Sequence, residues 1–268
     1  EVFATGVIAL LFVKMGLLRS STATISVLFA TIVFLTGGML GTFHHLYWSG
    51  TPIAVIAIGG VFSALEVVPL VLIGFEAYDH YKLKQSSDWV RFYHWPIMFM
   101  LAVAFWNLVG AGLLGFLINP PLALYYMQGL MSTATHAHAA LFGVYGMLAI
   151  GLLLFCMRGL SNPANWSDGL LKWAFWSFNI GLALMLVLSL LPQGIVQTMV
   201  SVRDGYWFAR SPELMHSPLM EALVWMRVPG DMVFAFGVAC LVLFMIRLYR
   251  KPTAEIEGGE MPGVEQHR

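Results

Sequence analysis

Long apolar segments place the strongest constraint on what this chain can fold into. A helix of about 20 mainly apolar residues spans the hydrocarbon core of a bilayer. Seven segments meet this requirement, and they cover residues 1–19, 22–46, 51–77, 91–117, 134–157, 170–196 and 220–247. Only 10% of the residues are charged, whereas a soluble domain usually carries about 25%. We therefore predict an all-α, polytopic transmembrane bundle of seven spans over residues 1–250, followed by a polar tail over 251–268.

The distribution of Lys and Arg orients this bundle, because positive residues favour the cytoplasmic side. The second and fourth connections contain neither residue, and the sixth, with Arg203 and Arg210, departs from the pattern. The basic residues of the odd connections and the C-terminal end are Lys14, Arg19, Lys82, Lys84, Arg91, Arg158, Lys172, Arg247, Arg250 and Lys251. We predict that the odd connections and the C-terminus are cytoplasmic and that the even connections face the periplasm.

Two further properties of the chain bear on its partners. The formal net charge is zero, which gives no indication of a nucleic-acid partner. The sequence also opens inside an apolar helix, at EVFATGVIALLF. We therefore expect a fragment of a longer membrane domain, with the lipid bilayer as its surroundings.

Two pairs of histidines lie at the predicted periplasmic ends of helices. His44 and His45, in GTFHHLYW, end the second predicted span, and His136 and His138, in TATHAHAALFG, begin the fifth. Imidazole is a suitable ligand for iron, copper and zinc, and ionisable groups at membrane depth are candidates for function. The four side chains are therefore predicted to gather around metal at one depth of the bundle.

Helix geometry separates the roles of the two pairs. Adjacent residues on a helix differ in direction by about 100°, so His44 and His45 can reach one ion. Residues two apart differ by about 200°, so His136 and His138 point to opposite faces, where each can be an axial ligand of a different haem. The alternative is that each ring is an interfacial side chain that reaches toward the lipid headgroups. Two pairs at one depth favour metal binding over that alternative. The remaining histidines do not join them, and these are His80, His94, His216 and His267.

Three carboxylates are further candidates. Glu66, in FSALEVVPL, lies inside the third predicted span, and Glu1 lies in a similar apolar setting. A charged side chain at that depth is costly unless it has a use, which suits a proton carrier or a group beside a metal. Asp231 follows Arg227 by four residues in RVPGDMVF. That spacing is typical of an ordinary ion pair on a helix, and a functional role for Asp231 remains open beside it.

Four of these stretches occur in an order and spacing that resemble a known family. GTFHHLYWSG, FSALEVVPL, NLVGAGLLGF and ATHAHAALFGVYGMLAIGLL resemble the catalytic subunit of bacterial respiratory nitric oxide reductases, most nearly the single-chain quinol-dependent type. The resemblance runs along nearly the whole chain. It implies the C-terminal half of the haem–copper oxidase fold, a domain of 12–14 helices in the bacterial inner membrane. It also implies two b-type haems, one low-spin and one high-spin, with a non-haem iron facing the high-spin haem.

The resemblance implies roles for individual residues. His44 and His45 correspond to ligands of the non-haem iron, His136 to the proximal ligand of the high-spin haem and His138 to an axial ligand of the low-spin haem. Glu66 corresponds to a family glutamate near the two-metal site that is associated with proton supply.

Two weaker correspondences complete the implied site. Glu1 corresponds to the second glutamate of an H-x-x-x-E-G-x-x-E pattern, and Asp231 to an acid near the quinol site. The other iron and haem ligands would lie in an N-terminal part of the same chain, which is then an expected partner. The other partners expected from the resemblance are nitric oxide, membrane quinol and a second copy in a homodimer. The expected reaction is the reduction of two NO to nitrous oxide and water in denitrification or NO detoxification.

Three other classes of protein share part of these features. A haem–copper oxygen reductase carries both histidine motifs, but uses copper and often has a Lys on the helix after the His pair. Here the segment 51–77 has no Lys and carries Glu66, which favours the NO enzyme. A cytochrome c-dependent NO reductase needs a haem c subunit, and this chain has no C-x-x-C-H motif. A membrane protein without metal is the third alternative.

The isolation of Glu66 on an apolar helix generates a first prediction. In the complete enzyme, Glu66→Ala should leave the haem content largely intact but lower the turnover of NO by about tenfold or more, the scale expected when a proton-transfer group is removed. Haem spectra and NO consumption by the purified variant provide the measurement. Turnover close to that of the wild type would make Glu66 a structural residue.

Overall fold

The computed structural model describes residues 2–14, 16–65, 67–84, 88–161 and 165–250, and every regular element in these ranges is a helix. The predicted all-α class is therefore confirmed. The elements before residue 85 are α1 (Val2–Lys14), α2 (Ser20–Gly41), the 3-10 helix η1 (Thr42–Leu46), α3 (Ile53–Leu65) and α4 (Val67–Lys84).

Most of the later elements join into longer continuous helices. They are α5 (Asp88–Phe92), α6 (His94–Trp106), η2 (Asn107–Leu113), α7 (Leu114–Ile118), α8 (Pro121–Met127), α9 (Met131–Ala140), η3 (Leu141–Gly146), α10 (Met147–Leu160), α11 (Asp168–Leu184), η5 (Met185–Leu190), α12 (Leu191–Asp204), η6 (Phe208–Arg210), α13 (Pro212–Met215), α14 (Pro218–Trp225) and α15 (Val228–Arg250). The segments η2, η3 and η5 are π-helical turns within longer helices.

In the described ranges, four helices are long and apolar enough to cross a membrane. They are His94–Ile118, Met131–Leu160, Asp168–Asp204 and Pro218–Tyr249. They coincide with the last four predicted spans and extend most of them by a few residues. The first three predicted spans fall on α1 to α4, where the structure gives shorter apolar helices such as Ile53–Ser63. The count of seven spans therefore remains a prediction.

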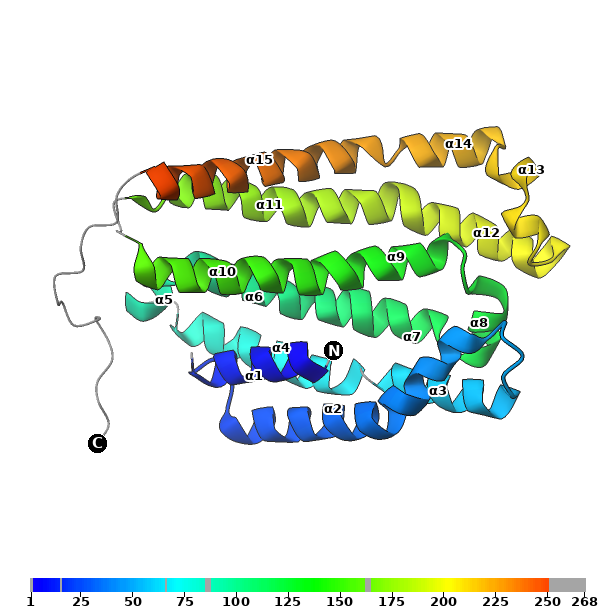
Figure 1. The fold of residues 1–268 in the computed structure, drawn as a ribbon, viewed down its shortest axis with the longest axis horizontal. Helices are drawn as coiled ribbons and strands as arrows, with labels where there is room; N and C mark the ends of the chain where they lie inside the picture. Colours follow the sequence, from blue (N-terminus) through cyan, green and yellow to red (C-terminus); the bar gives the residue numbers. More distant parts are fainter. Residues whose placement is uncertain (1, 15, 66, 85–87, 162–164, 251–268) are drawn as a thin grey trace.

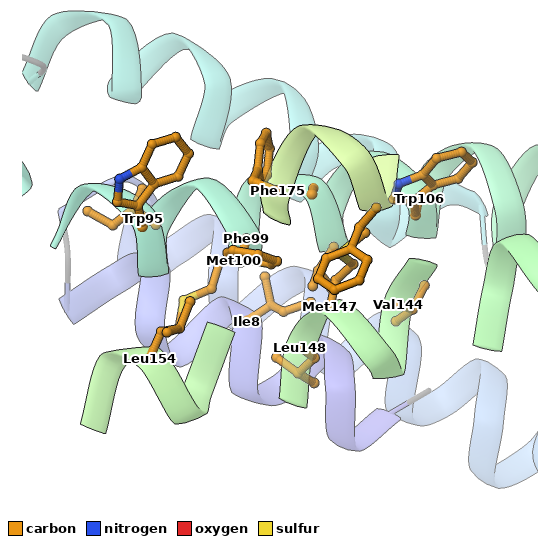
Figure 2. Close-up of a cluster of buried hydrophobic side chains, with 14 of the residues drawn as sticks. Ile8, Trp95, Phe99, Met100, Trp106, Val144, Met147, Leu148, Leu154 and Phe175 are labelled. Atoms are coloured by element: carbon orange, nitrogen blue, oxygen red, sulfur yellow. The ribbon is translucent and has the colours of Figure 1, made fainter. Parts of the chain in front are cut away.

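The long helices run side by side along the long axis of the molecule (Figure 1). Helix α11 packs against α15, α10 against α6, and α2 against both α3 and α4. Buried apolar side chains fill the space between these elements. The side chains labelled in Figure 2 come mainly from α6 and α10, with Val144 from η3, Phe175 from α11 and Ile8 from α1. Among them, the rings of Phe99 and Phe175 meet edge to face with their centres 5.3 Å apart.

Polar contacts close one end of the bundle, which holds the connections after α1 and α10 (Figure 1). The backbone N–H and the Nε of Arg19 both donate to Oε1 of Glu76, at 2.8 and 2.9 Å. Nε of Arg158 donates to the carbonyl of Phe92 at 2.9 Å, and its guanidinium stacks over the rings of Phe92 and Trp166. The connections of this end are thereby tied to neighbouring helices.

The even connections meet at the opposite end, as the predicted topology requires. The ring of Trp48, from the second connection, lies 6.1 Å from that of Tyr125 and 4.9 Å from that of Tyr206. Arg203 and Arg210, which departed from the charge pattern, are both engaged here. Arg203 pairs with Asp204 at 2.8 Å, and Arg210 lies over the rings of Tyr206 and Trp207.

Close packing of α11 on α15 generates a prediction. A Cβ added at Gly181 would lie 2.7 Å from the backbone nitrogen of Phe234, whereas one added at Gly169 would meet nothing within 4 Å. Small residues let membrane helices approach closely. Gly181→Ala should therefore destabilise the protein by about 1–3 kcal/mol through overpacking.

Gly169→Ala on the same helix is the matched control and should be neutral or slightly stabilising, because alanine is the better helix former. Thermal unfolding of both variants in one detergent measures the difference. Equal stability of the two variants would show that α11 and α15 can separate there without loss.

Candidate functional site

Helix α9 carries both histidines of the H-A-H motif and is surrounded by π-helical turns. It packs against η2 and η5 and continues directly into η3. A Cβ added at Gly110 of η2 would lie 2.7 Å from the backbone of Ala139, so these two helices are in backbone contact. π-Helical turns occur frequently at functional sites. They were not predicted from the sequence, although the glycines of NLVGAGLLGF mark the place of η2.

His136 is oriented by a carbonyl of η2. Its Nδ1 lies 2.7 Å from the carbonyl oxygen of Gly110. A carbonyl oxygen can only accept a hydrogen bond, so Nδ1 carries the proton and donates it. In the neutral imidazole the lone pair then resides on Nε2. A Cβ at Gly115 would lie 3.2 Å from Cε1 of this ring, so a second glycine makes room for it.

His138 also carries its proton on Nδ1, but a different carbonyl accepts the hydrogen bond. Its Nδ1 donates to the carbonyl of Ala134, one turn earlier on α9, at 2.9 Å. Its Nε2 lies 3.3 Å from a terminal nitrogen of Arg227, which can only donate. The two rings thus contact different elements, η2 and the junction of α14 with α15, as the helical spacing of the motif predicts.

Arg227 links His138 to the acid that the sequence singled out. Its Nε donates to both carboxylate oxygens of Asp231, at 3.1 and 3.2 Å. The ordinary ion pair expected from the spacing therefore exists, and through Arg227 it extends to His138. The chain Asp231–Arg227–His138 could not be predicted from the sequence, because Arg227 and His138 are 89 residues apart and meet only through tertiary packing.

The H-H pair is only partly described. His45 lies exposed in η1, and its carbonyl accepts a hydrogen bond from Nε2 of Gln128 at 3.3 Å. The side chain of His44, and Glu1 and Glu66 entirely, lie outside the described residues. Among the side chains that are described, no three of the His, Cys, Asp and Glu residues gather as a metal site. The ligand role of His44 and His45 therefore remains a prediction.

Three of the four histidines that were not expected to bind metal have partners away from α9. Nδ1 of His80 lies 2.9 Å from the carbonyl of Glu76, the ring of His94 meets that of Trp95, and His216 lies 3.7 Å from Glu221. His267 lies outside the described residues.

A partly buried polar contact that the sequence did not reveal joins two helices. Nδ2 of Asn119 donates to Oγ of Ser63 at 2.6 Å, which ties α3 to the end of α7. A Cβ added at Gly60 would lie 2.5 Å from the carbonyl oxygen of Asn119. Helix α3 is therefore seated closely against the helix whose η2 turn orients His136.

Comparison with known proteins identifies the family of the chain. Residues 1–233 match the family described as cytochrome c and quinol oxidase polypeptide I. The chain is also 25% identical over 217 residues to a nitric oxide reductase subunit from Stutzerimonas stutzeri, covering 76% of this chain and 43% of that protein. The chain thus spans less than half the length of this curated relative. Because the family match covers most of its length, the chain belongs to the cytochrome c and quinol oxidase polypeptide I family, the haem–copper oxidases.

Proposed function

We propose that this chain is part of the catalytic subunit of a bacterial nitric oxide reductase, which takes electrons from membrane quinol. The observation that carries the proposal is the geometry of α9, where His136 and His138 both bear the proton on Nδ1 and face different neighbours. Likeness to the nitric oxide reductase subunit of Stutzerimonas stutzeri supports the same conclusion.

The two histidines of α9 are suitable ligands for haem, which is the group that the family implies. A metal-binding imidazole usually donates its other ring nitrogen to a carbonyl or carboxylate, which fixes the tautomer and the ring. Gly110 and Ala134 provide these carbonyls. His136 would hold the high-spin b haem and His138 the low-spin b haem, each through Nε2. For His138 this requires Arg227 to give up its contact with that nitrogen while it keeps its pair with Asp231.

Iron is the proposed metal at the third metal site, which is the non-haem site of His44 and His45. By affinity alone, imidazoles favour copper over iron(II), so His44 and His45 need a hard oxygen ligand to select iron. A glutamate from the rest of the complete protein would be such a ligand, and Glu66 and Glu1 are the carboxylates of this chain proposed to stand near it.

The overall reaction joins two NO with two protons and two electrons and yields nitrous oxide and water. When bound, the haems and the iron supply electrons and stabilise charge that develops on oxygen. The protein holds these groups in place, which makes the coupling of two NO a local step, and Glu66 and Glu1 are proposed to pass protons. Asp231 is proposed to lie near the quinol. The expected setting is the bacterial inner membrane, with the metals toward the periplasm and the C-terminus in the cytoplasm.

An oxygen reductase is the second candidate function. The description of the matched family names cytochrome c and quinol oxidases, and such an enzyme would use the same histidines with copper instead of non-haem iron. The two candidates therefore differ in a quantity that can be measured directly.

Metal analysis of the complete purified protein tests the proposal. We expect three irons per catalytic chain, two of them in haem, and no stoichiometric copper, because an added oxygen ligand disfavours copper relative to iron. Inductively coupled plasma mass spectrometry combined with a haem assay gives both numbers. One copper with two irons per chain would exclude the NO-reductase function and favour the oxygen reductase.

The assignment of the two faces of α9 generates a separate prediction. In the complete enzyme, His138→Ala should remove the low-spin haem signal while the high-spin haem remains, because the family resemblance assigns His138 to the low-spin haem and His136, which contacts a different element, to the high-spin haem. Optical and electron paramagnetic resonance spectra distinguish the two haems. His216→Ala is the control, since that exposed ring lies beside Glu221 and should alter neither signal. Loss of the high-spin signal alone in His138→Ala would mean that the two faces are assigned wrongly.

A further inference from the structure

Helix α9 begins without a cap of its own. The residue before it, Leu130, offers no side-chain hydrogen bond to the first turn, although the first N–H groups of any helix need partners from outside it. The N–H of Met131 instead donates to Oε1 of Gln197 at 2.8 Å. A side chain of α12 therefore caps the helix that carries His136 and His138.

Gln197 is held firmly enough to define where α9 starts. Its side chain is buried, with only 4% of the residue exposed. The Nε2 of the same amide donates to the carbonyl of Ala209 at 3.0 Å and contacts Sδ of Met215 at 3.2 Å. One amide thus joins α9, η6 and the end of α13, and its orientation is fixed from both sides.

Close backbone packing one turn away on α12 also holds α12 against the start of α9. A Cβ added at Gly194 would lie 2.6 Å from the backbone nitrogen of Ser132 and 2.9 Å from its Cα. Helix α12 therefore presents a bare backbone to the first turn of α9 at Gly194, and an acceptor at Gln197. The two contacts together resist both sliding and rotation of α9.

The distance from this cap to the histidines is short. His136 and His138 follow Met131 by five and seven residues, which is less than two helical turns beyond the cap, since a turn takes about 3.6 residues. An α-helix transmits a shift of its first turn along its axis, so the height and the rotation of both rings depend on where Met131 is held.

We propose that Gln197 is a positioning residue for the H-A-H motif: through Met131 it sets the direction in which Nε2 of His136 and of His138 point. This inference rests on the proposed function, because it assumes that both Nε2 atoms bind haem. It assigns no direct contact with haem or substrate to Gln197.

The test uses the complete protein with three variants. Gln197→Met keeps the volume of the side chain but offers no oxygen to Met131. Gln197→Glu is the rescue, because a neutral buried carboxyl again offers an acceptor and a donor. Gln193→Met is the matched control, since Gln193 is equally buried one turn earlier and its amide donates to Ser189 of the same continuous helix.

Two measurements are made on each variant. Hydrogen exchange reports on the amides of residues 131–135, and the resonance Raman and electron paramagnetic resonance spectra report on the iron–histidine bonds of both haems. In Gln197→Met we expect amide exchange in the first turn of α9 to rise roughly fivefold, the effect of losing one hydrogen bond, together with shifted or broadened haem signals. Gln197→Glu should restore both, and Gln193→Met should change neither.

The outcomes separate this inference from the function on which it rests. Unchanged exchange in Gln197→Met would show that Gln197 does not hold the start of α9. Faster exchange with unaltered haem signals would reduce Gln197 to a structural cap and overturn its positioning role. A wild-type protein without haem would overturn the proposed function and the positioning role with it, while the exchange data would still decide whether the cap exists.

Discussion

The close approach of helix backbones at glycine is the constraint on which the rest of this structure depends. In a membrane, apolar side chains gain little by leaving lipid for protein, so helices associate through tight packing and hydrogen bonds. Gly110 brings η2 against Ala139, and Gly194 brings α12 against Ser132. Both contacts fall on α9, one near each end. The histidine helix is therefore held between two backbones, which is a firmer support than interdigitated side chains.

This packing has a chemical consequence at the histidines. Because η2 lies so close, the carbonyl of Gly110 reaches Nδ1 of His136 and fixes its tautomer. His138 uses a carbonyl of its own helix for the same purpose. Both rings then present Nε2, but in directions set by different neighbours. One short helix thus carries two imidazoles whose tautomers are fixed by different carbonyls, as the proposed binding of two haems requires.

The sequence predicted the all-helical class of the chain better than it predicted the contacts between its helices. Apolar length and helical spacing were sufficient for the last four spans and for the opposite faces of His136 and His138, because both depend on local geometry. The π-helical turns were not predicted, and the link between Arg227 and His138 and the cap supplied by Gln197 depend on residues far apart in the chain. The charge pattern did not account for Arg203 and Arg210, although their partners lie close to them in the chain. It counts positive residues, whereas an ion pair with Asp204 and the rings of Tyr206 and Trp207 offset their charge locally.

The contact of Arg227 with His138 changes how Asp231 should be understood. From the spacing alone, an ion pair and a functional role were alternatives for this acid. In the structure the ion pair is present and extends to a third residue, since the carboxylate of Asp231 holds Nε of Arg227 while a terminal nitrogen of the same guanidinium reaches Nε2 of His138. Because the guanidinium is planar and its donors are fixed relative to each other, the position of Asp231 determines where the charge of Arg227 lies beside the imidazole. An ion pair of ordinary spacing thereby becomes part of the electrostatic environment of His138, without direct contact between Asp231 and the ring.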